Sequence, residues 1–313
     1  MILVAGATGN LGSEICRRLR TRGAAVRGLA RATSTPDRVE ALGAMGVEVV
    51  RGDLRDRASL DAACRGVETV ISTVSMIVTA QPGDSFDDTD NAGTRALIDA
   101  AKAMGAPRFI FVSFDWSLFP DSPLCRAKRD VERHLRESGL TFTILHPALF
   151  MESWLGSIIG LDTSAGTARI FGSGDNRLSY VAIGDVAELA VQCVTNPAAN
   201  NATIALGGPE VMRQRDAIGI FEDVVGRPFT ITAVPETVLG DQWSAAADPF
   251  EKAFAGLMLG VTRDFVVDNT EVARSFAVPL TSVREYAERV VGGEARRARY
   301  VAPERGTGAE TGG

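Results

Sequence analysis

Three glycines near the start of the chain are spaced to bind a dinucleotide. Gly6, Gly9 and Gly12 follow the apolar run Met1–Ala5 and open a helical pattern. In such a strand–turn–helix context the first glycine permits a tight turn, the second lets the backbone approach a pyrophosphate, and the third lets helix and strand pack closely. Free N–H groups at the helix N-terminus would then meet the phosphates. The alternative is a plain turn with flexible glycines.

The residues after the second and third predicted strands concern the adenosine end of such a site. An NAD site usually offers an acid to the ribose 2′-hydroxyl after the second strand, but this chain has no acid between Glu14 and Asp37 and offers Arg31 instead. A guanidinium would bind a 2′-phosphate, so NADP(H) is favoured over NAD(H), unless Arg31 is simply solvated. Asp53 and Leu54 follow the third strand and would contact the adenine, or would form an ordinary turn before a helix.

Short apolar runs alternate with helical patterns through the first half of the chain, which predicts an α/β fold with a Rossmann-type, doubly wound parallel sheet. The expected strands are Ile2–Ala5, Ala25–Ala30, Val47–Val50, Thr69–Thr73, Phe109–Ser113, Thr141–Leu145 and Leu178–Ile183, and the expected helices lie near 10–22, 36–44, 57–65, 88–104 and 124–138. Residues Asp185 to Glu188 form a D-x-x-E capping signal for a further helix.

The regular alternation of strand and helix patterns ends near residue 150. We expect a nucleotide-binding Rossmann domain over 1–150, to which 178–195 returns, a smaller substrate or lid subdomain over most of 151–292, and a flexible tail over 293–313. Within the helix near 124–138, Val131 and Leu135 would share the buried stripe, while Arg129, Glu132, Arg133 and Arg136 cover the rest and His134 is solvated.

Composition narrows the function classes. The 313 residues carry a net charge of −6, which disfavours binding to nucleic acid or to an anionic membrane. Four scattered cysteines and two histidines offer no metal-site spacing, so no metal is expected. The first apolar run is too short for a signal peptide and no stretch is long enough for a transmembrane helix, so a cytoplasmic location is expected.

Taken together, these segments resemble the atypical short-chain dehydrogenase/reductase superfamily, in its NmrA-like and isoflavone-reductase-like branch, over about residues 1–235. The supporting segments are 6–12, 52–54, 91–101, 108–113, 145–152, 185–187, 207–210 and 226–228. The resemblance implies a Rossmann fold that binds NADP(H). Its cofactor residues carry over as Gly6, Thr8, Gly9, Asn10, Leu11 and Gly12 for the pyrophosphate, Arg31 for the 2′-phosphate, Asp53 and Leu54 for the adenine, Ser72 and Thr73 for the adenosine ribose, and Ser113, Lys128, Pro147 and Phe150 around the nicotinamide.

The catalytic pattern departs from the superfamily at one position. Its Tyr-x-x-x-Lys motif keeps the lysine as Lys128, but Leu124 stands where the tyrosine would be, and leucine cannot donate a proton. Lys128 would hold the nicotinamide ribose or act as an acid or base, or it is an exposed helix lysine. Ser113 would bind a substrate carbonyl or merely cap its strand. The residues Phe114, Asp115, Trp116, His146 and Trp154 are expected at the substrate, with core packing as the alternative for the tryptophans and for His146.

Two functions follow. The first is an NADPH-dependent oxidoreductase that transfers a hydride to a small quinone, enone or carbonyl; quinones suit the missing tyrosine because their reduced anion is delocalised. The second is a redox sensor that binds NADP(H) without turnover and signals to a protein partner. A nucleotide-sugar epimerase needs the absent tyrosine and is disfavoured. A small-molecule substrate is expected in the first case, and a homodimer or protein partner is compatible with both.

Overall fold

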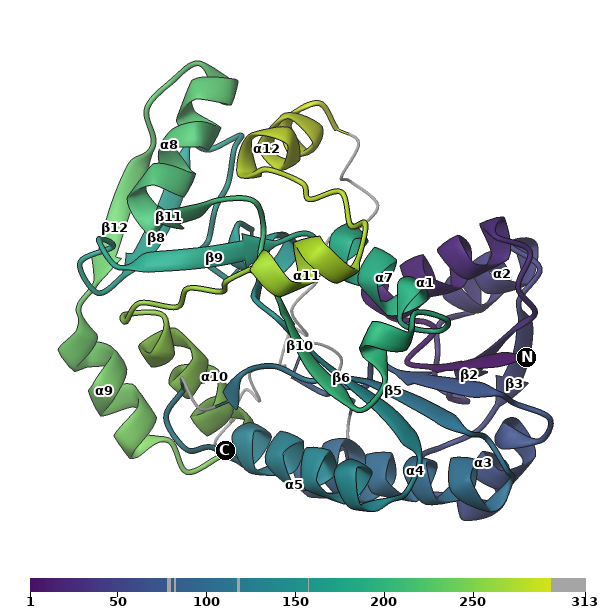
Figure 1. The fold of residues 1–313 in the computed structure, drawn as a ribbon. Helices are drawn as coiled ribbons and strands as arrows, with labels where there is room; N and C mark the ends of the chain where they lie inside the picture. Colours follow the sequence, from purple (N-terminus) through teal and green to yellow (C-terminus); the bar gives the residue numbers. More distant parts are fainter. Residues whose placement is uncertain (78–79, 82, 117–118, 157, 294–313) are drawn as a thin grey trace, which may run out of the picture.

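A seven-stranded parallel sheet forms the centre of the computed structural model, which describes residues 1–77, 80–81, 83–116, 119–156 and 158–293 (Figure 1). In spatial order its strands are β10 (Ala202–Leu206), β6 (Thr141–Pro147), β5 (Arg108–Val112), β4 (Thr69–Ser72), β1 (Ile2–Ala5), β2 (Val26–Ala30) and β3 (Glu48–Arg51). The order reverses between β1 and β4, which is the point where open α/β sheets bind ligands.

Helices cover both faces of this sheet, because alternate strand residues point to opposite sides. Ile2 and Val4 of β1 face one core, with α1 (Asn10–Thr21), α2 (Pro36–Ala44) and α7 (Ile183–Gln192). Leu3 and Ala5 face the other core, with α3 (Arg57–Cys64), α4 (Thr94–Ala103) and α5 (Pro123–Glu137). Figure 1 shows α3, α4 and α5 as one layer beneath the sheet. The expected α/β doubly wound fold is confirmed.

The remaining elements form a second region beside the carboxyl ends of the strands (Figure 1). It holds two small sheets, β11–β9–β7 and β12–β8. Its elements are β7 (Leu149–Phe150), α6 (Met151–Trp154), β8 (Thr167–Phe171), β9 (Arg177–Val181), β11 (Val211–Arg213), α8 (Gln214–Val225), β12 (Thr230–Val234), α9 (Glu236–Ala245), α10 (Pro249–Gly260), α11 (Thr270–Ser275) and α12 (Val283–Val291). Helix α10 packs against α5 of the first region.

Two expectations for residues 178–195 are wrong. The strand ends at Val181, and it pairs with β7 and β11 rather than returning to the central sheet. Helix α7 does return, but it begins at Ile183, so Asp185 lies inside its first turn instead of capping it. The central sheet takes its seventh strand from β10, which the sequence did not mark.

The other predicted strands agree with the structure within two residues. The predicted helix at 88–104 is instead a π-helical segment, η1 (Phe86–Gly93), followed by α4. Short π-helical segments are frequent at functional sites.

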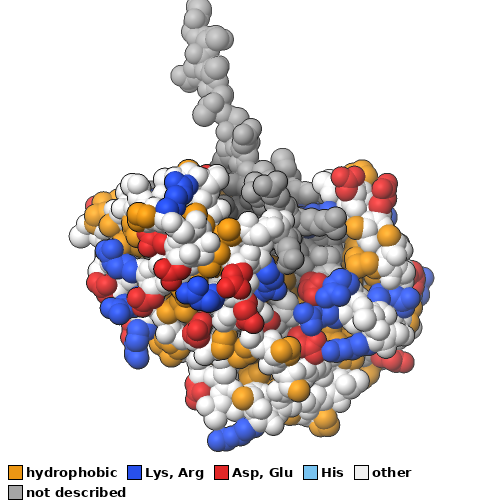
Figure 2. Space-filling model, turned by 90° about the horizontal axis from the view of Figure 1, so that it is seen from above, with side chains coloured by type: hydrophobic (Ala, Val, Ile, Leu, Met, Phe, Trp, Pro, Cys, Tyr) orange, Lys and Arg blue, Asp and Glu red, His pale blue; other side chains and the backbone are white. Residues whose placement is uncertain are grey.

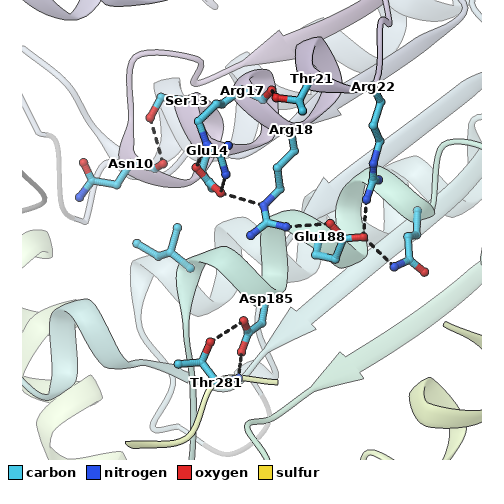
Figure 3. Close-up of polar contacts among 12 residues, drawn as sticks. Asn10, Ser13, Glu14, Arg17, Arg18, Thr21, Arg22, Asp185, Glu188 and Thr281 are labelled. Atoms are coloured by element: carbon cyan, nitrogen blue, oxygen red, sulfur yellow. Dashed lines mark hydrogen bonds and ion pairs between the residues drawn. The ribbon is translucent and has the colours of Figure 1, made fainter. Parts of the chain in front are cut away.

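Ion pairs tie α7 to α1, and hydrogen bonds tie the C-terminal segment to α7 (Figure 3). Arg18 and Arg22 of α1 both reach Glu188, at 2.8 and 2.6 Å. Asp185 accepts hydrogen bonds from the backbone N–H and the hydroxyl of Thr281, at 2.7 and 2.9 Å. These contacts hold α7 between α1 and the segment leading to α12.

Two further features are the distribution of charge on the surface and the length of the described helices. On the face shown in Figure 2, acidic and basic side chains are interspersed rather than gathered by sign. Among the described helices, none has the length and apolar character needed to cross a bilayer.

Candidate active site

One cavity of about 830 Å³ runs along the carboxyl ends of the central strands. Its walls come from the turn after β1, the ends of β2, β3, β4, β5 and β6, the start of α5, and α10 from the second region. This is a large volume for a small-molecule site. The cavity therefore connects residues that the sequence assigned separately to phosphate, adenosine, nicotinamide and substrate.

The glycine turn has the backbone geometry that a phosphate cradle needs. Gly6 has φ of +80°, a left-handed conformation that favours glycine. A Cβ on Gly12 would overlap the Gly6 carbonyl oxygen, so glycine is required where α1 crosses the strand. Helix α1 begins after Gly9, and no described side chain caps it. Thr8, Gly9, Asn10 and Leu11 line the cavity, with the first N–H groups of α1 at its edge.

Arg31 lies in the cavity, but it is paired with an acid that the sequence analysis did not assign. Its Nη1 lies 2.8 Å from Oδ2 of Asp84, whose side chain is only 4% exposed. Thr33, close to Arg31 in the sequence, donates a hydrogen bond to Gln81, which lies in the same segment as Asp84. A second arginine, Arg38, also lines the cavity and donates to the carbonyl of Thr8 at 2.7 Å. This part of the adenosine end therefore offers two guanidinium groups beside the carboxylate of Asp84.

The neighbouring strand ends carry the residues expected at adenine and ribose. Asp53, Leu54 and Thr73 line the cavity. Arg55 donates to both oxygens of Asp53, and these bonds lower the pKa of that carboxyl to about 2. Ser72 does not line the cavity. It is fully buried, and strand alternation points its side chain to the same face of the sheet as Val70, toward the layer of α3, α4 and α5. Of the two residues expected at the adenosine ribose, the structure therefore places only Thr73 on the cavity wall.

Lys128 is buried rather than exposed, and its side chain lines the cavity. Its ammonium donates to the Val74 carbonyl at 2.9 Å and lies 3.4 Å from Oδ1 of Asp90 in η1. The Phe111 ring centroid is 5.0 Å away. Burial lowers the pKa of Lys128, and the charge of Asp90 opposes this shift. Burial likewise raises the pKa of Asp90, which also accepts the Met76 N–H. Asp90 was not expected at the site from the sequence, because it lies within a run of polar residues that carries no recognisable motif.

Ser113 lines the cavity, yet its hydroxyl donates to Glu132 at 2.6 Å. His146 lies against the same carboxylate oxygen, at 2.8 Å from Nε2. Glu132 was expected on the solvated face of its helix, but this expectation is wrong, because the residue is only 1% exposed. Its spacing of four residues from Lys128 was the available signal, because both then share one helix face. His146 itself is not among the described residues that line the cavity.

The far end of the cavity is apolar. Phe150, Trp154, Phe254 and Leu257 line it, as do Phe114, Phe119 and Phe265. The last three pack edge to face, with ring centroids 5.5 and 6.0 Å apart. Leu124 is 3% exposed and also lines the cavity, one helical turn before Lys128. Pro147 lines it as expected.

Besides His146, two of the expected substrate residues lie outside the cavity wall. Asp115 and Trp116 are not among the described lining residues, and the Trp116 ring stacks under the Arg129 guanidinium, 5.6 Å from its centroid.

Glu152 is a further acid at the cavity, and nothing in the sequence indicated a role for it. Both carboxylate oxygens accept from the Ile183 N–H at the start of α7, at 3.0 and 3.1 Å. Burial raises the pKa of Glu152 to about 7, and the nearby charge of Asp185 adds to this shift. The group therefore changes charge near neutral pH.

The geometry agrees with comparisons to known proteins. The chain belongs to the NmrA-like family, whose sequence model matches residues 1–259. A reductase of Streptomyces griseus, (4-alkanoyl-5-oxo-2,5-dihydrofuran-3-yl)methyl phosphate reductase, is 36% identical over 231 residues, covering 73% of this chain and 75% of that protein. The chloroplastic protein High chlorophyll fluorescence phenotype 244 of Arabidopsis thaliana is 31% identical over 243 residues, and the match covers 76% of this chain but 59% of that relative.

Solved structures share the fold. The NADPH-dependent quinone oxidoreductase of Escherichia coli, solved in complex with NADPH, has a TM-score of 0.74 at 21% identity, covering 93% of this chain and 100% of that one. The resemblance to the NmrA-like and isoflavone-reductase-like proteins is thus confirmed, together with the Rossmann-type fold.

Proposed function

We propose that this protein is an NADPH-dependent reductase that transfers a hydride to a small quinone, enone or carbonyl acceptor. The observation that carries the proposal is that one continuous cavity joins the glycine turn, the two arginines, Lys128 and an apolar chamber. The names of two similar proteins, a reductase and an NADPH-dependent quinone oxidoreductase, support it.

The residues present fit NADPH. Gly6 to Gly12 and the N-terminus of α1 would hold its pyrophosphate, and Arg31 with Arg38 would hold its 2′-phosphate. Pro147 and Phe150 would border its nicotinamide, where the bound cofactor supplies a hydride. The Lys128 ammonium donates to the Val74 carbonyl and forms an ion pair with Asp90, so a further N–H of its three would serve a ribose hydroxyl or an acceptor oxygen in the cavity.

The apolar chamber favours an uncharged, flat acceptor. Its phenylalanine and tryptophan side chains would stack on a ring and exclude water from the reacting pair. The Streptomyces relative is named for a substrate in which an alkanoyl group and a ring carbonyl sit on one dihydrofuran that also carries a methyl phosphate. Only the ring of such a compound suits the apolar chamber of this chain, because its phosphate is charged.

NADPH oxidation tests the proposal. Purified protein should oxidise NADPH with menadione, 9,10-phenanthrenequinone or 4-nitrobenzaldehyde, followed by loss of absorbance. The double variant Lys128→Met, Asp90→Asn removes both charges and so leaves no unpaired ion in the core. It should lose activity by about 10²-fold or more, whereas Lys102→Met, at an exposed lysine of α4, should not.

The alternative, a sensor that binds NADP(H) without turnover, is favoured by Leu124, because the cavity has no hydroxyl at that position. Calorimetric binding of NADPH with no oxidation by any of the three acceptors would support the sensor and contradict the reductase.

A further inference from the structure

A buried polar network lies where α5 covers the ends of β5 and β6. The Ser113 N–H donates to the Leu145 carbonyl at 2.8 Å, which sets Ser113 beside His146 on the neighbouring strand. Phe111 and Ile144 face the core under α5, so strand alternation points Ser113 and His146 to the same side. The side chain of Glu132, which belongs to α5, contacts both Ser113 and His146.

Glu132 is held as an ionised acceptor. Oε1 accepts from Ser113 Oγ at 2.6 Å and lies 2.8 Å from His146 Nε2, while Arg136 donates to Oε2 at 3.1 Å. Burial opposes the charge, but the hydrogen bonds from His146 and Ser113 hold the pKa of Glu132 below its ordinary value. A carboxylate can only accept, so the His146 proton lies on Nε2.

The two ends of this network lie in different surroundings. Ser113 lines the cavity beside Lys128. The side chain of His146 is 15% exposed and lies outside the described cavity wall. A chain of two short hydrogen bonds, sharing one carboxylate oxygen, therefore runs from the cavity to a histidine that water can reach.

We propose that Ser113, Glu132 and His146 form a relay that carries a proton from solvent to the oxygen of the acceptor. The inference rests on the proposed reductase function. In the absence of an acceptor the Ser113 hydroxyl donates to Glu132, and for the transfer it turns to the acceptor oxygen. As the acceptor gains its hydride, the Ser113 O–H bond breaks and a new O–H bond forms on the product. His146 takes up a proton from solvent at Nδ1 and releases its Nε2 proton to Glu132 Oε1, which passes it to Ser113 Oγ, and exchange with solvent restores the starting tautomer. Each turnover thus consumes one hydride and one solvent proton, so atoms and charge balance.

This assignment supplies the proton donor that Leu124 cannot provide. Ser113 is the catalytic residue of the three, because it alone lines the cavity. Glu132 and His146 act through Ser113 and are positioning residues that also pass the proton. The relay matters most for a carbonyl acceptor, whose alkoxide needs a proton at once, and less for a quinone, whose delocalised anion can be protonated later by solvent.

The first test uses the protein without cofactor. The chain has two histidines, and His134 pairs with Asp99 at 2.7 Å, which makes it a matched control. Proton NMR should show a slowly exchanging imidazole N–H at low field that disappears in His146→Gln and remains in His134→Gln. Absence of this resonance from the wild-type protein, or its survival in His146→Gln, would overturn the relay.

The second test compares two acceptors. His146→Gln keeps an N–H facing Glu132 but cannot pass a proton, so the fold and the KM for NADPH should be unchanged. With 4-nitrobenzaldehyde its kcat should fall by about 10²-fold, and with menadione by much less. Ser113→Ala should show the same selective loss, and His134→Gln should match wild type with both acceptors.

The outcomes separate the two proposals. A wild-type protein that reduces both acceptors while His146→Gln and Ser113→Ala keep full kcat refutes the relay and leaves the reductase standing. Equal losses with both acceptors also refute it, because they indicate a merely structural role. A wild-type protein that oxidises NADPH with neither acceptor refutes both proposals.

Discussion

At the scale of single residues, the pairing of Arg31 with Asp84 sets the balance of charge at the adenosine end. The guanidinium that would bind a 2′-phosphate already contacts a carboxylate whose side chain is almost fully buried. A phosphate arriving there would meet an attractive arginine and a repulsive aspartate together. The acid should therefore reduce the affinity for NADPH without being needed for NADH.

Two substitutions test this balance by calorimetry. Arg31→Ala should weaken NADPH binding by roughly ten- to a hundredfold, the effect of losing a charge-assisted bond of about 1.5–3 kcal/mol. Asp84→Asn should instead tighten NADPH binding a few-fold, on the order of 1 kcal/mol for a partly exposed pair. NADH affinity should stay nearly constant in both variants, and equal changes for the two cofactors would show that Arg31 does not read the phosphate.

At the scale of elements, the packing of α1 onto β1 depends on one missing side chain. Gly12 lies against the Gly6 carbonyl, and a Cβ there would also come within 3.0 Å of Ala7 Cα. The same close approach points the first turn of α1 at the cavity. Binding and packing at this turn therefore share one geometric requirement.

Gly12→Ala should lower the free energy of unfolding by about 1–3 kcal/mol, the usual cost of overpacking, and should abolish NADPH binding. Gly240→Ala in α9 is the matched control, since nothing lies within 4 Å of its Cβ position. That variant should be stabilised by roughly 0.5–1 kcal/mol, because alanine suits a helix interior better than glycine. Urea unfolding of both variants measures the difference, and similar effects at the two sites would contradict the packing argument.

At the scale of the whole molecule, Glu152 lies where the two regions meet. It follows β7 at the cavity, accepts from the first N–H of α7, and feels the charges of Asp185 and Arg289. Its pKa is raised to about 7 in the folded state from an ordinary 4.5. The protonated form is thus favoured by folding, so the stability it contributes is full below pH 4.5 and is lost as the pH rises through about 7.

Glu152→Gln removes this titration. Relative to wild type, the variant should gain stability between pH 5 and pH 8, by at most about 3 kcal/mol, because each tenfold change in proton affinity corresponds to about 1.4 kcal/mol. Guanidinium unfolding of both proteins at the two pH values measures the change. A difference in stability that stays constant with pH would show that Glu152 titrates normally in the fold.

The sequence by itself determined the α/β class, the succession of the first six central strands along the chain and the glycine turn, whereas the expected positions of Lys128, Pro147 and Phe150 came from the resemblance to the NmrA-like family. These features follow from local rules, because strand and helix periods and glycine positions depend on neighbouring residues along the chain.

Only the tertiary structure decided how the charged groups pair. Asp90 with Lys128, Asp84 with Arg31, and Glu132 with Ser113 and His146 join residues from separate elements. Glu132 appeared solvated because a helix rich in charges does not reveal which polar stripe its neighbours bury, and β10 was missed because its place beside β6 depends on where the chain returns. Long-range packing sets burial, and burial sets the charge chemistry of this cavity.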